Sequence, residues 1–288
     1  MKKPILLILP LIALPLVGCV PNLVKATGKV IEKEYLIDED ATKLSIKDIL
    51  IKDDMSSYYP EVTLYEDGDK KVVFTYEESL AKEIKVNANE GLLSISGNKN
   101  KRFISDGVKI DIYGFVFDDL KLDSCHILDT NKALNKNYVK VDINDAAIFE
   151  EEFITTKKME VNVSSASSFD VMHINTETFS LNVKNASKVE IDDLLAIDAT
   201  LNAQNASKLY VKDGIITNLN SKVESAAKAD LKGIKVVKAN IDVSGASNAS
   251  YQASELVSGK VSGASSVDLY GGAPTKLDVT GASKVTNK

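Results

Sequence analysis

The stretch VNVSSASSFDV, residues 161–171, contains the pattern that decides the fold of this chain. Apolar and polar residues alternate before the small residues in its middle, and they alternate again after them. Alternation with a period of two predicts strands that bury one face and expose the other. We therefore expect two short strands joined by a corner of small residues.

This pattern returns along the C-terminal half of the chain at a nearly fixed interval. The alanines of the corner are Ala146, Ala166, Ala186, Ala206, Ala226, Ala246, Ala264 and Ala282. A repeat of about 20 residues is too short for paired helices and is typical of a solenoid in which each repeat forms one coil. Further apolar residues, such as Ile174, Leu194, Ile215 and Ile234, are expected to supply the return side of each coil. We predict an all-β fold, a right-handed parallel β-helix with three short sheets around a flattened core.

The residues around each alanine indicate why the chain bends there. The preceding residue is Asp, Ser, Asn or Gly in every repeat, and these types tolerate a left-handed backbone or hydrogen-bond their own turn. We expect the alanine methyl to point inward, where coils stacked about 4.8 Å apart leave little room. On that reasoning, Ala206→Phe would overpack the core and cost about 1–3 kcal/mol. The serines that follow the alanines are expected to form a ladder of hydroxyls.

The part of the chain before the repeats is expected to cap the solenoid. Residues 120–126 fit the repeat with Cys125 in the position of the alanine, which indicates a ninth, degenerate coil. Residues 38–119 alternate without a fixed period and contain Asp67-Gly68 as a hairpin signal. They predict a β-rich part that protects the terminal strands of the solenoid from pairing with other molecules. We divide the chain into a leader (1–18), a tether and linker (19–37), this N-terminal part (38–119) and the coils (120–288).

The first residues predict where the protein is located. Lys2 and Lys3 precede an apolar stretch, residues 5–17, that is too short and too interrupted by proline to span a bilayer as a helix. The sequence LVGC, residues 16–19, resembles the lipobox of bacterial lipoproteins, in which the cysteine becomes the acylated first residue. The resemblance implies lipidation at Cys19 and an extracytoplasmic protein held on a membrane of the cell envelope by its acyl chains. The alternative is a signal peptide cleaved at another small residue, with Cys19 an incidental thiol.

Charge and cysteine content exclude several classes of function. The formal net charge is −6 at neutral pH, and it becomes more negative if Lys2 and Lys3 leave with the leader. Nucleic-acid binding needs a concentrated basic face, so we expect no nucleic-acid partner. The chain has two cysteines, Cys19 and Cys125. Acylation of the first would leave a single thiol, which excludes a disulfide framework and a cysteine zinc site.

Few residues suggest catalysis, and for each of them a structural role is the simpler expectation. Cys125 and His126 are adjacent, so on a strand they point to opposite faces and cannot form a thiolate–imidazole pair without a bulge. The spacing assigns no acidic partner to His173, which we expect in a solvated loop. Two columns are expected along the solenoid: a broken acidic row of Asp170, Glu190 and Asp230, and a basic column of Lys188, Lys208 and Lys228.

Three acidic runs offer oxygen ligands to a divalent cation, namely Asp118-Asp119, Glu150-Glu151-Glu152 and Asp192-Asp193. They lack the glycine-spaced loop of a calcium site, so solvated turns are the simpler interpretation. We predict no catalytic residue, no metal and no cofactor.

The corner phrase and the upstream strands together resemble the bacterial head GIN domain family of auto-transporter adhesin heads. The matching segments are 244–247, 262–265, 280–283, 61–68 and 91–96. The resemblance covers residues 38–287 and implies a right-handed parallel β-helix behind a lipoprotein or secretory leader, with an adhesin-like role and no catalytic residues. The middle coils depart from the family in having Asn or Ser where Gly is usual.

Three functions remain open at this point. The first is a membrane-anchored, non-enzymatic module that displays repeated side chains to a glycan or an envelope protein through many weak contacts. The second is a β-helical enzyme that degrades polysaccharides, which would need carboxylates converging in one groove. The third is a regulatory envelope component that acts through a protein partner. We favour the first.

Overall fold

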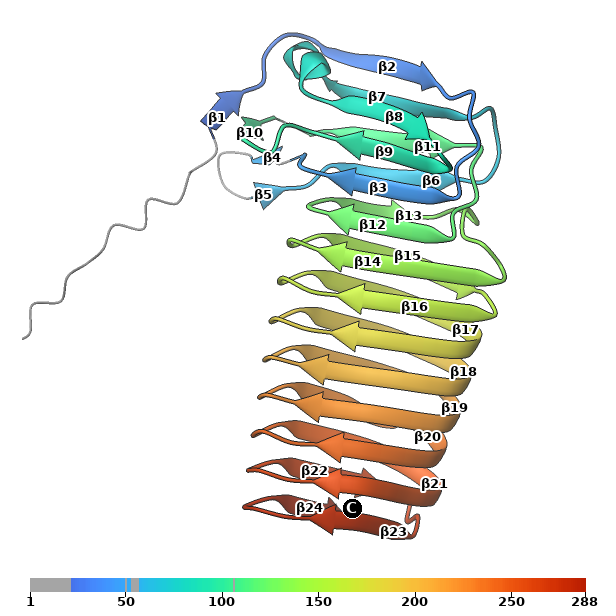
Figure 1. Ribbon diagram of the computed structural model, residues 1–288, viewed down its shortest axis with the longest axis vertical. Helices are drawn as coiled ribbons and strands as arrows, with labels where there is room; N and C mark the ends of the chain where they lie inside the picture. The colour runs from blue at the N-terminus through green and yellow to red at the C-terminus, as the bar shows by residue number, and fades with distance from the viewer. Residues whose placement is uncertain (1–21, 50, 53–56, 106) are drawn as a thin grey trace, which may run out of the picture.

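The computed structural model describes residues 22–49, 51–52, 57–105 and 107–288. The described chain forms a tall, flattened column of stacked coils that wind in a right-handed sense below an N-terminal cap (Figure 1). This is the parallel β-helix that the repeat predicted. Cys19 and the predicted leader lie outside the described residues. Within the described ranges, no helix has the length and apolar character needed to cross a membrane.

The cap contains most of the short strands. Its elements are β1 (Asn22–Lys25), β2 (Val30–Leu36), β3 (Lys43–Lys47), β4 (Ile51–Lys52), β5 (Ser57–Tyr58), β6 (Glu61–Tyr65), β7 (Lys71–Glu77), the 3-10 helix η1 (Glu78–Lys82), β8 (Lys85–Asn89), β9 (Leu92–Ser96), β10 (Lys101–Ile104) and β11 (Lys109–Tyr113).

The coils follow without a break. Their strands are β12 (Asp119–Asp123), β13 (His126–Asp129), β14 (Tyr138–Asn144), β15 (Ile148–Thr155), β16 (Lys158–Val163), β17 (Ser168–Val183), β18 (Lys188–Gln204), β19 (Lys208–Glu224), β20 (Lys228–Val243), β21 (Asn248–Val261), β22 (Ser266–Tyr270), β23 (Thr275–Val279) and β24 (Lys284–Asn287).

Each middle coil has three sides, as the burial pattern of β17 shows. Buried and accessible side chains alternate along 168–171, 173–176 and 178–183, and two adjacent exposed residues interrupt the alternation at each junction. The pairing of β17 with β18 skips a residue at the same two places. The strand therefore bends twice, which produces three short sheets. We call the sides that contain 178–183, 168–171 and 173–176 the front, back and narrow faces.

Two ladders of paired strands run the length of the column. On the front face the order is β8, β9, β3, β12, β14, β16, then segments of β17 to β21, then β23. On the back face it is β2, β7, β11, β6, β13, β15, then segments of β17 to β21, then β22 and β24. Antiparallel pairs occur only at the cap end of these two ladders, so the cap continues the sheets of the solenoid.

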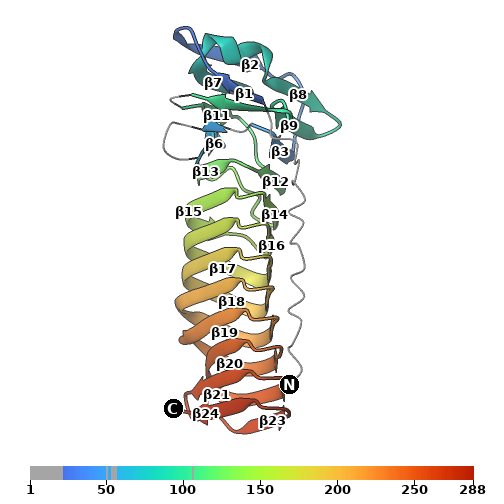
Figure 2. The same ribbon diagram turned by 90° about the vertical axis from the view of Figure 1, so that its left-hand side faces the viewer.

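The corner between the front and back faces is a tight turn with left-handed residues. At Asn205 and Ala206, φ is 54° and 59°, and the N–H of Ser207 donates to the carbonyl of Gln204 over 3.3 Å. A four-residue turn with positive φ at both central residues is a type I′ turn. These turns stack along one edge of the column, which faces the viewer in Figure 2. The small polar residues before each alanine are therefore required by the backbone.

The alanines of this turn do not face the core, which corrects our prediction. They form a column along the turn edge, but their side chains are exposed, except for that of Ala146, which is half-buried. The buried position comes one residue later, at Ala147, Ser167, Ser187, Ser207, Ala227, Ser247 and Ser265. Strand alternation cannot be counted through two left-handed residues, because they turn the chain away from the extended path on which that alternation depends. The methyl of Ala206 does not point into the core, so the reason that we gave for overpacking by Ala206→Phe is wrong.

The inward serines bond the backbone of the turns. The hydroxyl of Ser207 donates to the carbonyl of Val183 and accepts from the N–H of Gln204, each over 3.0 Å. Ser247 and Ser265 donate to the carbonyls three residues before them. These bonds satisfy buried polar groups that would otherwise be costly. The column therefore bonds the backbone of its own turns and of the neighbouring coil, in place of the expected ladder of hydroxyls bonded to each other. Ser167 is the exception among the described serines of this column, because its hydroxyl has no hydrogen-bond partner there.

The turn of the first coil is one residue shorter, which also corrects the predicted place of Cys125. Asp123 pairs with Asn144 and His126 pairs with Ile148, so two residues span the turn where the next coil has three. Cys125 is fully buried and precedes His126 as Ala147 precedes Ile148. It therefore belongs to the inward column.

The same substitution at Ala206 and at Ala227 should have different effects. We expect Ala206→Gly to be neutral or to stabilise the protein by up to about 1 kcal/mol, because glycine adopts positive φ without strain. Ala227→Gly should cost about 1–2 kcal/mol, because it removes a buried methyl and frees the backbone. Urea unfolding of both variants beside the wild type tests this. Equal losses would contradict the assignment of the inward column.

Candidate functional site

The accessible side chains of the front face form continuous polar rows along the column. One row consists of Asn87, Ser94, Ser45, Lys121, Asp142, Asn162, Asn182, Asn202, Lys222, Asp242, Lys260 and Asp278, each in register with the next. Because alternate residues of a strand share a face, the register alone aligns these side chains. The front face thus offers hydrogen-bonding groups from the cap to the last coil.

The middle of this row is ordered by side-chain hydrogen bonds. The amide of Asn162 donates to Asp142 over 2.7 Å, Asn182 donates to Asn162 over 2.9 Å, and Asn202 donates to Asn182 over 2.9 Å. A side-chain amide has two N–H donors and a carbonyl with two lone pairs, so each stacked amide keeps some capacity for a ligand. The ladder holds these groups in a fixed, repeating array.

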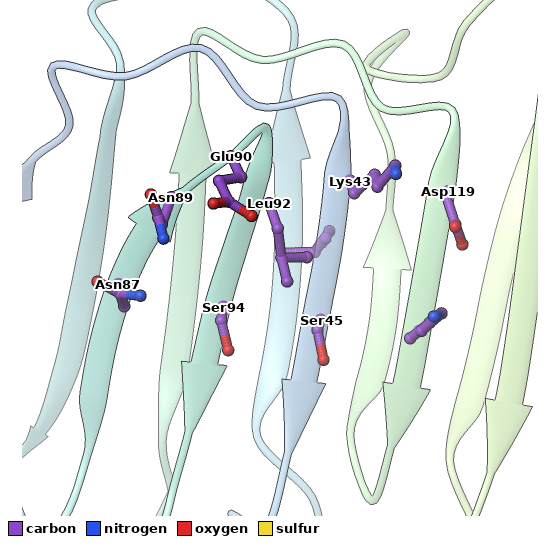
Figure 3. Close-up of a pocket in the computed structure, with 10 residues that line it drawn as sticks. Lys43, Ser45, Asn87, Asn89, Glu90, Leu92, Ser94 and Asp119 are labelled. Carbon is purple, nitrogen blue, oxygen red and sulfur yellow. The ribbon is translucent and has the colours of Figure 1, made fainter.

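The row widens into a pocket where the cap meets the first coil (Figure 3). The cavity has a volume of about 510 Å³ and is formed by β8, β9, β3 and β12. Ser94 and Ser45 lie side by side on neighbouring strands, and Asp119 lies near Lys43 at one end (Figure 3). The remaining lining residues are Leu44, Asn87, Asn89, Glu90, Leu92 and Lys121.

A second pocket continues the first along the coils. Its volume is about 290 Å³, and it is lined by Lys121, Asp123, Asp142, Asn144, Asn162, Val163, Ser164, Asn182 and Lys184. Lys121 borders both cavities, so the two lie next to each other on either side of β12. We call the two pockets together the front groove. Each of its two pockets contains two carboxylates, Glu90 and Asp119 in the first and Asp123 and Asp142 in the second.

The carboxylates of β12 carry the unusual electrostatics of the groove. One oxygen of Asp119, Oδ1, is buried and has no hydrogen-bond partner in the described part of the chain. Burial raises the pKa of Asp123; a hydrogen bond from Asn144 opposes this, and the nearby charge of Asp145 adds to it. Buried polar groups are normally bonded, and perturbed carboxyl groups concentrate at functional sites. Asp119 therefore has an unsatisfied acceptor at the edge of the groove, and Asp123 has a charge that burial disfavours.

This groove was not predicted from the sequence. Asp119 was predicted only as part of an acidic run, although Asp119, Lys121 and Asp123 alternate along one side of β12. These side chains line a cavity only because β3 pairs with β12 and β9 pairs with β3, which places residues 43–47 and 92–96 next to them. Only the folded cap creates the cavity.

Cys125 and His126 do not form a catalytic pair. Burial raises the pKa of the Cys125 thiol, and the side chain points into the core. His126 is on the other side of the strand, where its Nε2 lies 3.1 Å from Oε2 of Glu150. The two groups face in opposite directions, as strand geometry requires.

The acidic row and the basic column both lie on the back face. Glu150, Asp170 and Glu190 are register partners, and burial together with repulsion from these neighbours raises the pKa of Asp170. Lys188, Lys208 and Lys228 are likewise in register. Lys188 bonds Glu190 over 2.9 Å, which offsets part of both charges. Among the described residues, no group of three or more His, Cys, Asp or Glu side chains is arranged to hold a metal ion.

His173 is not in a solvated loop, which corrects our expectation. It belongs to β17 on the narrow face, and its ring stacks on that of Phe153 with centroids 4.7 Å apart. Its Nδ1 lies 3.5 Å from Oδ2 of Asp193, the register partner in the next coil. Asp193 follows His173 by one coil, so the spacing of the repeats already indicated this partner.

Comparison with known proteins gives a family and several structures of similar fold. Residues 57–213 and 171–273 match the family described as "Putative auto-transporter adhesin, head GIN domain". A search of curated proteins gives no match.

Three of the similar structures come from Parabacteroides species. A "putative adhesin" from Parabacteroides merdae is 14% identical, with a TM-score of 0.69, and the alignment covers 93% of this chain and 99% of the other. A "putative adhesin" and a "putative lipid binding protein" from Parabacteroides distasonis are each 12% identical, with TM-scores of 0.64, over 93% of this chain and all of the other. At these identities the likeness establishes the fold alone. The family matches, in contrast, run from residue 57 to residue 273, so this chain belongs to the head GIN domain family.

Proposed function

We propose that this protein is a lipid-anchored, non-enzymatic binding module of the bacterial cell envelope, and that its front groove holds a glycan chain. The family description as an adhesin supports a binding role. The observation that carries the choice of site is the buried Oδ1 of Asp119, which has no partner within the described chain. A ligand hydroxyl would supply the missing hydrogen bond once the Asp119 side chain turns this oxygen toward the pocket.

The chemistry of the groove matches a hydroxyl-rich ligand of low charge. Its lining is dominated by amides, hydroxyls and carboxylates, which can each bond sugar hydroxyls as acceptor or donor. Lysines and carboxylates are mixed along it, so neither a polyanion nor a polycation is favoured. The polar rows repeat at each coil, about 4.8 Å apart. A repetitive chain could therefore gain affinity from many weak contacts.

The tether would set the orientation of the column. Cys19 is three residues before Asn22, where β1, the first strand of the cap, begins. Three residues span at most about 10 Å. Acylation of Cys19 would therefore bring the cap, with the wider pocket, next to the membrane, and the coils would extend away from it.

Removing the carboxylate of Asp119 should weaken glycan binding. We expect the chain without its leader to bind a neutral or weakly charged polysaccharide on a glycan array. Asp119→Ala should lower the affinity about tenfold or more, because a hydrogen bond to a charged group is lost. Asp242→Ala is the control, since Asp242 is exposed on the same face but lies far from both pockets. Unchanged affinity in Asp119→Ala, or no glycan bound by the wild type, would exclude this site.

The charge of Asp123 should lower the free energy of unfolding at neutral pH. Its folded pKa is raised, so the folded state holds the proton more tightly and stability falls as pH rises through that range. Asp123→Asn cannot ionise. Its urea midpoint should exceed that of the wild type at neutral pH, and the difference should disappear near pH 3, below the ordinary pKa of Asp (about 3.9). A difference that is constant with pH would contradict the burial of this charge.

The anchor can be tested separately. Labelled palmitate should enter the wild-type protein in a bacterial host and should not enter Cys19→Ala, because the thiol is the acceptor. Gel fluorography of the two proteins provides the measurement. Equal labelling would refute lipidation at Cys19 and leave the groove proposal intact.

A further inference from the structure

The narrow face carries large apolar side chains that the fold does not require to be apolar. The residues are Phe153, Met172, Leu195, Ile197 and Ile215, with exposed fractions of 61, 52, 38, 52 and 52%. The exposure of Ile215 corrects our expectation that it supplies the return side of its coil; Ile216 is the buried residue there. These apolar residues lie on four consecutive coils: Phe153, Leu195 and Ile215 are on the narrow face itself, and Met172 and Ile197 are at the bends on either side of it. The narrow face forms the edge of the column opposite the turns (Figure 1). We call these apolar residues together the apolar strip.

Polar residues occupy the same positions in the neighbouring coils. Leu195 and Ile215 are register partners, but Asn175 precedes them and Lys235 follows them in that column. The backbone therefore accepts polar side chains at these positions. A cluster of exposed apolar residues on a soluble protein marks an interaction surface more often than a chance feature.

The surroundings of the strip are mainly acidic. On these four coils the acidic residues outnumber the lysines; they are Glu152, Glu177, Asp192, Asp193, Asp198 and Asp213, against Lys157, Lys158 and Lys212. The following coil is basic, with Lys232, Lys235 and Lys238. Several of these lysines already have acidic partners: Lys158 pairs with Glu160 over 2.6 Å and Lys212 with Asp192 over 2.5 Å. In the following coil, Lys232 and Lys238 pair with Asp230 and Glu255. In the described part of the chain, Glu177, Asp198 and Asp213 form no ion pair with a basic side chain. The centre of this surface therefore has unmatched negative charge.

This charge discriminates between possible occupants. A second copy of the chain, packed strip to strip, would bring acidic borders against each other, and an anionic lipid surface would be repelled in the same way. A partner with apolar and basic side chains would satisfy both features of the surface.

We propose that the apolar strip docks a short, basic amphipathic helix of a partner protein. The coils are spaced about 4.8 Å apart, and one turn of an α-helix rises 5.4 Å. A helix laid along the column would thus present about one apolar side chain to each coil, with its lysines or arginines over the acidic borders. This surface is separate from the front groove, so the inference does not depend on glycan binding.

A designed peptide can serve as the probe. The peptide has about 18 residues, with leucines on one helical face and lysines beside them, and the comparison peptide has glutamates in place of the lysines. By fluorescence anisotropy, the lysine peptide should bind the wild type at least about tenfold more tightly than the glutamate peptide. Leu195→Ser with Ile215→Ser should lower that affinity about tenfold or more, because two half-exposed side chains no longer contribute apolar area.

Matched variants separate this result from general attraction to an acidic protein. Val30→Ser with Leu36→Ser changes two aliphatic side chains of the cap that are 65% and 70% exposed, and it should leave the affinity unchanged. Glu177→Gln with Asp198→Asn should weaken binding several-fold and reduce its salt dependence. Asp119→Ala in the front groove should have no effect on the peptide.

Three outcomes would overturn the proposal. They are equal affinity for the two peptides, unchanged affinity in Leu195→Ser with Ile215→Ser, and a wild-type dimer in light scattering that this same double variant dissociates. The last result would identify a second copy of the chain as the occupant. Circular dichroism and urea midpoints of each variant confirm that lost binding does not reflect lost folding.

Discussion

The whole structure depends on strict register between neighbouring coils. Each coil pairs with the next through parallel strands, so a residue and its partner one coil later point in the same direction and share the same burial. Inside the column this alignment produces continuous apolar stacks, such as the rings of Phe149 and Phe169, whose centroids are 5.3 Å apart. A slip of one residue in any coil would exchange its inner and outer faces, so the hydrophobic pattern strongly favours a single register.

The turns maintain this register at one edge of the column. A short turn with left-handed residues reverses the chain within a fixed length, and the inward serines satisfy its backbone groups. Glycine replaces Asn and Ser in the last coils. At Gly263 and Gly281 only the glycine is left-handed, as in a type II′ turn. Gly245 and Ala246 are still both left-handed, so the change in turn type comes only at Gly263, one coil after glycine first appears.

Register also determines what the outer surface presents. Because the front and narrow faces consist of aligned columns, chemistry that is repeated in the sequence becomes a row or a strip in space. The front face is polar and contains a groove at the junction of cap and coils, whereas the narrow face combines apolar side chains with acidic borders. A rigid solenoid can therefore offer two separate surfaces, since each depends on a different set of columns.

The sequence by itself determined the fold class, the approximate repeat length and the alternation of the strands, because these follow from local periodicity. It also contained the acidic row and the lysine column, which are spaced by one coil. It did not determine which small residue of the turn faces the core, because two left-handed residues interrupt the alternation from which burial is inferred. The partner of His173 lies one coil away, so the repeat spacing already contained it. The pocket around Asp119 was decided by the tertiary structure, because it depends on β3, β9 and β12, which are distant in the chain, being placed side by side.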